Sequence, residues 1–217
     1  KSPWGEGRPG WHIECAAMSM KYLGETIDIH GGGQDLIFPH HENEVAQSEG
    51  ATGHDFCHYW MHNGYINIDN KKMSKSLGNF FTVRDILQKF DGIVVRFFML
   101  SAQYRNPVNF SDGLLEQAKA ALERVKNFKE NLAFIIDTKK DMPDSGVAGI
   151  NAVYTIRFNE AMDDDLNTAD AIVVIFEYIK EINVKFENGA NADEAKAALA
   201  LIDTLLGVLD INMESAD

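Results

Sequence analysis

Cysteine is scarce in this 217-residue chain, which contains only Cys15 and Cys57. Two cysteines cannot build a disulfide framework, so we expect a reducing compartment, and the cytoplasm fits best. No window approaches 18 consecutive apolar residues, so no membrane span is predicted. Hydrophobic residues make up 45% of the chain and charged residues 24%, which excludes general disorder and predicts a globular protein.

The chain also does not begin with methionine. It begins at Lys1 with KSPWGEGRPGW, which resembles neither a signal peptide nor a transit peptide. We therefore expect that another segment precedes this one. Internal repeats and low-complexity tracts are absent as well.

Basic residues are few relative to acidic ones, and their distribution is uneven. Residues 1–112 hold 10 Lys or Arg and 13 Asp or Glu, whereas residues 113–217 hold 10 and 20, giving net charges of −3 and −10. This balance argues against a broad nucleic-acid footprint but leaves room for a localised basic site. All seven histidines lie in the first part, so we expect the chemistry there: His12, His30, His40, His41, His54, His58 and His62.

The first part mixes short apolar runs with glycine-rich turns. Thr26–His30 reads as a strand that runs into a glycine loop, and Pro39 suits the first turn of a helix that stops near Gly50. Further predicted elements are strand-like pieces around Met61 and over Tyr65–Ile68, a helix over Val83–Phe90 capped by Thr82 with Asp85, and a buried helix over Val94–Leu100.

The second part reads as helical throughout. Ser111 is the expected N-cap of a long helix, followed by a linker at residues 137–149. We predict an α/β part at residues 1–110 and a helical bundle at residues 111–217. The apolar face of the long helix is Leu115, Ala118, Leu122, Val125, Phe128 and Leu132, and the later helices are Ile150–Met162, Thr168–Phe186 and Asp193–Leu209.

Three side chains suggest a metal site. His40 and Glu44 are four residues apart on a predicted helix and therefore share one face, while Cys15 belongs to a separate segment. Thiolate, imidazole and carboxylate are suitable zinc ligands, and a tetrahedral site usually needs a fourth. The alternative is a buried structural cysteine beside a helix surface that bears His and Glu.

Two loops suggest nucleotide binding. In His30-Gly-Gly-Gly-Gln-Asp35, three glycines after a strand would let a ligand approach the backbone closely. In Lys71-Lys-Met-Ser-Lys-Ser-Leu-Gly-Asn79, ammonium groups three residues apart could bind a polyphosphate electrostatically. The alternatives are an ordinary glycine loop and a solvated basic loop.

Longer motifs resemble a known family. KMSKS at residues 72–76 matches the signature of class I aminoacyl-tRNA synthetases. GRPGWHIECAAMS, DIHGGGQDLIFPHHENEVAQS and KMSKSLGNFFTVRDIL are similar to cysteinyl-tRNA synthetases, as are RFFMLSAQYRNPVNFS and MDDDLNTADAI. The resemblance runs from about Trp4 to Asp170.

The resemblance implies a fold and an activity. The fold would be the C-terminal half of a class I Rossmann-type catalytic domain with a stem-contact region, followed by helices that contact tRNA. The activity would be ATP-dependent activation of cysteine and its transfer to tRNA(Cys), with ATP bound together with Mg²⁺ and the full-length enzyme a monomer. One Zn²⁺ would read the substrate thiolate.

The resemblance also implies roles for individual residues. Cys15, His40 and Glu44 would be three of four zinc ligands, and Lys72 and Lys75 would be catalytic. Substrate binding would fall to Trp11, His30 and Asp35, and ATP binding to Gly32, Gly33, Met73, Ser74, Lys75 and Ser76.

Some family features are missing from the chain. In the family, the fourth zinc ligand is a cysteine near the N-terminus, close to a His-x-Gly-His signature, and neither occurs here. The small C-terminal domain of the bacterial enzymes is not found in this chain either. We therefore expect a central-to-late piece of the enzyme that has little adenylation activity alone and holds zinc weakly.

Two other functions remain open at this stage. A ligase that forms the same cysteinyl-adenylate but gives the acyl group to an amino-sugar, as in mycothiol biosynthesis, would share the pocket motifs. A non-catalytic paralogue that binds a partner through its helices is the other alternative, and the intact KMSKS motif argues against it. His54, His58 and His62 are expected to be surface or packed residues rather than a second metal site.

Overall fold

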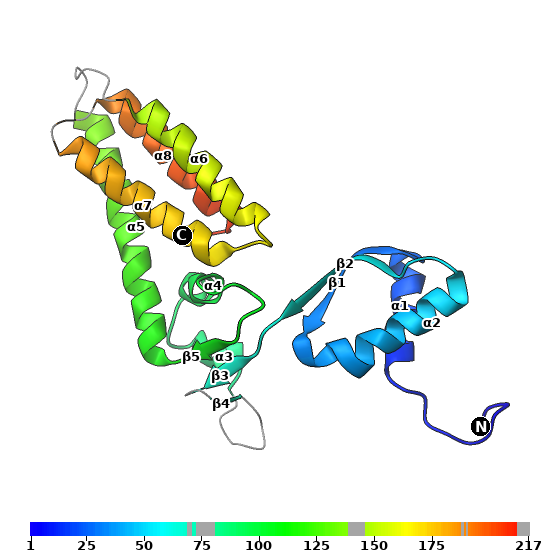
Figure 1. Ribbon diagram of the computed structural model, residues 1–217. Helices are drawn as coiled ribbons and strands as arrows, with labels where there is room; N and C mark the ends of the chain where they lie inside the picture. The colour runs from blue at the N-terminus through cyan, green and yellow to red at the C-terminus, as the bar shows by residue number, and fades with distance from the viewer. Residues whose placement is uncertain (69–70, 73–80, 139–145, 188, 190, 212–217) are drawn as a thin grey trace. The chain divides into compact units, whose positions relative to one another are not determined.

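The protein is described here from a computed structural model, which defines residues 1–68, 71–72, 81–138, 146–187, 189 and 191–211 (Figure 1). It divides into two compact units. Unit 1 comprises residues 1–65 and 104–107, and unit 2 comprises residues 66–103 and 108–217.

Unit 1 contains a two-stranded parallel sheet and two principal helices. Strand β1 (Ile27–Gly33) pairs with β2 (Cys57–Asn63) in a register that runs from Ile27 opposite Cys57 to Gly33 opposite Asn63. Parallel strands need a long crossover, and α2 (Glu42–Thr52) supplies it. Helix α1 (His12–Leu23), which precedes β1, packs against α2.

The segment that joins β1 to α2 differs from the sequence prediction. All three glycines belong to β1, because Gly31 and Gly32 pair with Met61 and His62 of β2 rather than forming a loop. A 3₁₀ turn at Gln34–Leu36 and a π-helical turn at Ile37–His41 follow.

The regular helix starts later than the predicted first turn at Pro39. Phe38 is extended, with φ −134° and ψ 132°, as is usual before proline, so α2 begins only at Glu42. The helix ends at Thr52, two residues after the predicted stop near Gly50. Gly53 closes it in the left-handed region, at φ +76°.

Unit 2 opens with a small mixed sheet and two short helices. Strand β3 (Ile66–Ile68) lies between β4 (Lys71–Lys72), which is antiparallel to it, and β5 (Val108–Phe110), which is parallel. At the start of α3 (Val83–Ile86), the expected capping pair is confirmed as a full capping box. Helix α4 (Gly92–Leu100) contains the predicted apolar run.

Four long helices complete the described part of unit 2 and confirm an α/β part followed by an all-α part. They are α5 (Asp112–Thr138), α6 (Val147–Asp163), α7 (Thr168–Phe186) and α8 (Ala192–Val208). Asn167 caps α7 by accepting a hydrogen bond from the Asp170 amide. The described part of the chain contains no helix with the length and apolarity needed to cross a membrane.

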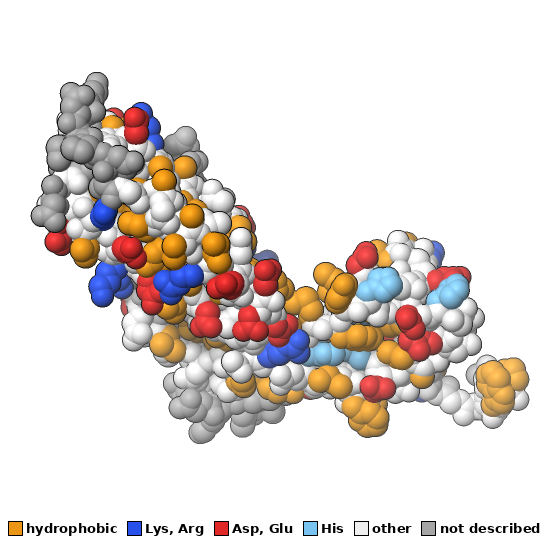
Figure 2. Space-filling view, turned by 45° about the horizontal axis from the view of Figure 1, so that its top comes forward, with side chains coloured by type: hydrophobic (Ala, Val, Ile, Leu, Met, Phe, Trp, Pro, Cys, Tyr) orange, Lys and Arg blue, Asp and Glu red, His pale blue; other side chains and the backbone are white. Residues whose placement is uncertain are grey.

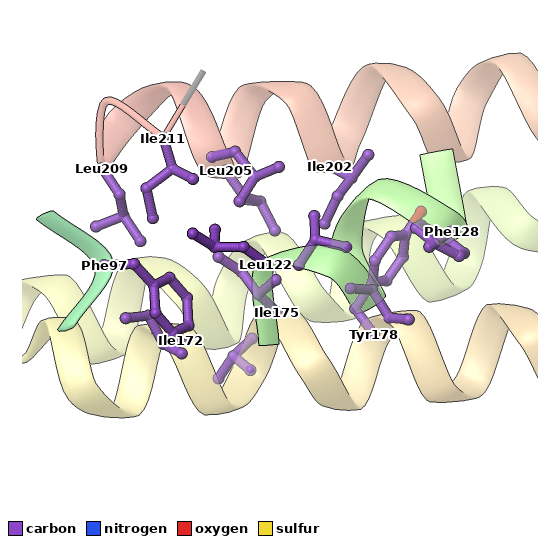
Figure 3. Close-up of a cluster of buried hydrophobic side chains, with 14 of the residues drawn as sticks. Phe97, Leu122, Phe128, Ile172, Ile175, Tyr178, Ile202, Leu205, Leu209 and Ile211 are labelled. Carbon is purple, nitrogen blue, oxygen red and sulfur yellow. The ribbon is translucent and has the colours of Figure 1, made fainter. Parts of the chain in front are cut away.

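The hydrophobic core of unit 2 is formed by the facing sides of these helices. All six residues of the face predicted on α5 are buried, with Leu115, Val125 and Leu132 at 0% exposure. Figure 3 shows how Leu122 and Phe128 of α5 meet Ile175 and Tyr178 from α7. The core therefore follows the helical periodicity of the sequence.

A pair of substitutions on α5 tests this packing. Leu132→Ala should lower the free energy of unfolding of the bundle by about 2–5 kcal/mol, because it removes a fully buried side chain and leaves a cavity. Phe134→Ala, on the same helix but at a side chain 61% exposed, should cost much less. Urea unfolding followed by circular dichroism measures both; equal losses would contradict the assigned face.

Candidate functional site

The candidate site of unit 1 is centred on Glu44, a carboxylate with 0% exposure. Glu44 lies in the first turn of α2, His40 lies one turn earlier in the π-helical turn, and Cys15 lies on α1. Packing of α1 against α2 brings these segments together. One ligand atom from each of the three residues lies within 4.8 Å of the other two. The structure therefore gathers the three residues predicted to bind a metal.

Two imidazoles lie against the Glu44 carboxylate. His30 Nε2 is 2.7 Å from Glu44 Oε2, and His40 Nε2 is 2.6 Å from Oε1. Both carboxylate oxygens are buried, and neither imidazole contact has hydrogen-bond geometry. Burying an uncompensated charge is costly, and a cation among these atoms would remove that cost.

The surroundings favour the neutral forms of Glu44, Cys15 and His40. Burial raises the pKa of Glu44. The pKa of the Cys15 thiol is also raised, first by burial and then by the Glu44 charge. Burial, followed by the nearby His12, lowers the pKa of His40. A divalent cation at this place would reverse the shifts of Cys15 and Glu44 and reinforce that of His40, because it favours thiolate, carboxylate and neutral imidazole.

The donor set determines which ion could bind. Thiolate, imidazole and carboxylate together are typical of zinc, whereas a calcium or magnesium site would use oxygen ligands alone. Glu44 also belongs to a second cluster, formed with His30 and His41, whose ligand atoms likewise lie within 4.8 Å of one another. The residues present thus fit a zinc ion, and Glu44 is the ligand common to both clusters.

Trp11 covers one side of the cluster. Its indole stacks on the His40 ring, with ring centroids 3.6 Å apart and planes 13° from parallel. The Trp11 side chain remains 55% exposed. Trp11, predicted to bind substrate, therefore presents an aromatic surface beside the candidate metal ligands.

His41 belongs to the second cluster and His62 lies against it, and neither position was predicted from the sequence. His41 is 4% exposed, and its Nδ1 is 2.8 Å from Nε2 of His62. The His62 ring in turn stacks on the Trp60 ring, with the ring centroids 5.8 Å apart. Burial, and then the neighbouring His30, His62 and His40, lowers the pKa of His41 to about 4. The sequence pattern that indicates this arrangement is the spacing of Trp60 and His62, because residues two apart on a strand share a face.

The glycine segment is tightly packed against the protein itself. A Cβ on Gly32 would lie 2.8 Å from Leu36 Cδ1 and 2.9 Å from His41 Cε1, and a Cβ on Gly33 would lie 2.5 Å from Asp35 Oδ1. A Cβ on Gly32 would therefore displace Leu36 and the buried His41, and one on Gly33 would displace the Asp35 side chain. Asp35 lies in the 3₁₀ turn after β1, and its side chain is directed back toward Gly33.

The predicted phosphate-binding residues lie largely outside the described part of the chain. Of the predicted KMSKS residues, only Lys72 belongs to the described part, and its backbone pairs in β4 with Asn67 of β3. Met73, Ser74, Lys75 and Ser76 lie outside the described residues.

His54 and His58 lie apart from the cluster. His54 is exposed and lies 2.8 Å from Glu25, and His58 is exposed as well. Among the described residues, His54, His58 and His62 do not form a common metal-binding group. The histidine side chains visible in Figure 2 all belong to unit 1.

Two family models match the chain. The model for the tRNA synthetases class I (C) catalytic domain matches residues 1–120, and the model for the DALR domain matches residues 157–214. The first match contains every described residue of the candidate site.

Curated relatives are similar over nearly the whole chain. A cysteine–tRNA ligase of Clostridioides difficile is 58% identical over 220 residues, which cover 100% of this chain and 47% of the relative. One from Carboxydothermus hydrogenoformans is 59% identical over 194 residues, covering 87% of this chain and 40% of the relative. The chain therefore spans about half the length of the curated relatives it matches.

A solved structure shows the same fold. The LeuRS of Agrobacterium radiobacter K84 agnB2, in its ternary complex with tRNA and LeuAMS, superposes with a TM-score of 0.69. The match covers 83% of this chain and 25% of that one, at 19% sequence identity. At this identity, the likeness concerns the fold alone.

Two glycine substitutions test the packing around the cluster. Gly32→Ala should lower the free energy of unfolding by about 1–3 kcal/mol, because the added Cβ overlaps Leu36 and His41. Gly50→Ala, within α2 and with nothing within 4 Å of its Cβ, should raise it by about 0.5–1 kcal/mol. Chemical denaturation measures both values, and a Gly32→Ala protein as stable as the unaltered one would refute the close packing.

Proposed function

Because the chain belongs to the class I tRNA synthetases, as the match of residues 1–120 to the class I (C) catalytic domain shows, we propose that it forms part of an enzyme that uses ATP to join cysteine to tRNA(Cys). The relatives named cysteine–tRNA ligase support this activity, as does the DALR match in the helical part. We assign residues 1–110 to the catalytic part and residues 111–217 to the helical part. The start of α5 at Asp112 supports this division.

The observation that carries the proposal is the convergence of Cys15, His40 and Glu44 beside Trp11. These three side chains would hold zinc. When bound, zinc supplies a coordination position that a thiolate fills well and a hydroxyl fills poorly. Serine is nearly isosteric with cysteine, so an apolar pocket alone separates the two weakly, whereas a coordination position separates them without a second editing site.

The other residues of unit 1 orient this site and the substrate. His30 contacts the carboxylate of Glu44 and so positions that ligand. We assign His30 and Asp35 to the environment of the substrate ammonium and the adenylate. Gly32 and Gly33 would allow the nucleotide close to the strand edge. Trp11 would form the wall of the pocket beside the sulfur.

ATP would be bound by the KMSKS segment. A carboxylate oxygen of cysteine attacks the α-phosphorus of ATP bound with Mg²⁺, the bond to the bridging oxygen breaks, and pyrophosphate leaves. The ammonium groups of Lys72 and Lys75 neutralise charge that develops on the departing pyrophosphate. Met73, Ser74 and Ser76 would complete the nucleotide contacts. A hydroxyl of the terminal ribose of the tRNA then attacks the carbonyl carbon, and AMP leaves.

The choice of acceptor distinguishes this proposal from the amino-sugar ligase. Both enzymes would form cysteinyl-adenylate, so the metal cluster is compatible with either. The relatives' names and the DALR match favour tRNA. If the full-length protein consumed the adenylate with an amino-sugar and not with tRNA, the acceptor assignment would be wrong.

Substitution of the two cysteines tests the metal site with an internal control. In the full-length protein, Cys15→Ser should weaken zinc retention by about tenfold or more and lower cysteine-dependent pyrophosphate exchange in parallel, because an oxygen replaces the thiolate ligand. Cys57→Ser should retain both, since Cys57 lies on β2 with its sulfur 2.9 Å from the Tyr59 carbonyl oxygen and belongs to neither metal-binding group of the described residues.

Zinc is measured by elemental analysis after dialysis against a weak chelator. Equal zinc content in the two variants would contradict the assignment of Cys15. Zinc loss without any change in exchange activity would contradict the role given to the metal.

A further inference from the structure

One segment of unit 1 comes from far along the chain. Residues 104–107, which we call the return segment, belong to unit 1 although the residues on either side of them belong to unit 2. Hydrogen bonds hold this segment within unit 1. The Gly64 amide donates to the carbonyl oxygen of Tyr104 at 2.8 Å. Gln34 Nε2 donates to the carbonyl oxygen of Arg105, also at 2.8 Å.

Close packing at the end of β2 fixes the position of the return segment. Gly64 follows Asn63, the last residue of β2, and a Cβ on Gly64 would lie 2.4 Å from the carbonyl carbon and oxygen of Asn106. The same Cβ would lie 2.7 Å from the Pro107 nitrogen. These are backbone atoms, which cannot move aside as the end of a flexible side chain can, and the ring of Pro107 restricts its own φ. The Arg105 carbonyl is therefore an acceptor in a well-defined place.

Gln34 opens the 3₁₀ turn Gln34–Leu36, which connects β1 with the π-helical turn that carries His40. None of the three residues of the 3₁₀ turn is buried, so packing does little to fix its position. The turn includes Asp35, which the proposed function assigns to the environment of the substrate ammonium and the adenylate. The hydrogen bond from the Gln34 side chain to the return segment supplies the constraint that burial does not.

We propose that Gln34 is a positioning residue for the binding of the amino acid, an inference that rests on the proposed function. Gln34 acts through Asp35, because its bond to Arg105 holds the turn so that the Asp35 carboxylate faces the substrate ammonium. A carboxylate attracts an ammonium and repels the phosphates of ATP, so the ammonium is the group that Asp35 would bind. Gln34 therefore sets how tightly the amino group of cysteine is held.

The chemistry of adenylation decides which kinetic constant should change. The reaction takes place at the carboxylate of cysteine and the α-phosphorus of ATP, and the ammonium keeps its charge throughout. Its attraction to Asp35 is therefore the same in the ground state and in the transition state, and such uniform binding affects KM and not kcat. The zinc ligands should be unaffected, because Glu44 and His40 are held by burial, at 0% and 4% exposure.

Two variants of Gln34 and one control test the proposal in the full-length protein. Gln34→Ala removes the side chain, whereas Gln34→Met keeps its length and lack of charge but has no donor. Thr26→Val is the matched control. Thr26 lies just before the opposite end of β1 and donates from Oγ1 to the carbonyl oxygen of Asp55 at 2.7 Å. The control therefore removes a bond of the same kind at a distance from Asp35.

The measurement is cysteine-dependent pyrophosphate exchange, with the zinc content determined on the same samples. Both Gln34 variants should raise the KM for cysteine by about three- to tenfold, the effect of one lost hydrogen bond, and leave kcat and zinc content unchanged. Thr26→Val should keep all three values. Mercaptopropionic acid has the thiol and carboxylate of cysteine but no amino group, so its inhibition constant against cysteine should be the same in every variant.

Each contrary result has a distinct meaning. If the unaltered protein shows no cysteine-dependent exchange, the proposed function fails and this inference fails with it. If exchange is observed but the Gln34 variants keep the KM of the unaltered protein, or Thr26→Val raises it equally, Gln34 does not position Asp35, and the proposed function stands. If the inhibition constant of mercaptopropionic acid rises together with the KM for cysteine, or if zinc is lost, Gln34 supports the pocket as a whole, and its link to the ammonium is wrong.

Discussion

The arrangement of unit 1 depends on one buried carboxylate. Glu44 has no solvent exposure, is contacted by His30 and His40, and faces the thiol of Cys15. A charge in this position is stable only with a compensating cation or a proton, and the neighbouring imidazoles are themselves shifted toward neutrality by burial. A metal ion would resolve this conflict, and under the proposed function its preference for sulfur would give the site a means of choosing its substrate.

Much of the fold could be predicted from the sequence, because the decisive signals are local. The bundle helices followed from apolar residues at steps of three and four, and Thr168–Phe186 is a helix with the predicted bounds. The capping box at Thr82 was predictable because its two partners are only three residues apart. The sequence signals were weakest where strand pairing decides the conformation. The three glycines expected in a loop belong to β1 because β2 pairs with them, and β5 and α1 were not predicted.

The candidate site shows the same division between local and distant information. His40 and Glu44 share a helical face by spacing alone, and the motif resemblance connected them with Cys15. The contact of His30 with Glu44 and the pair formed by His41 and His62 join residues 14 and 21 positions apart. Such contacts arise from the crossover between parallel strands, which no short window of sequence encodes.

The sulfur content of the metal's coordination shell tests the central claim most directly. The full-length protein loaded with zinc would be measured by X-ray absorption at the zinc edge, alone and with cysteine or serine added. The account predicts one additional sulfur neighbour at about 2.3 Å with cysteine and none with serine. An unchanged sulfur count with cysteine, at a concentration that saturates pyrophosphate exchange, would contradict it.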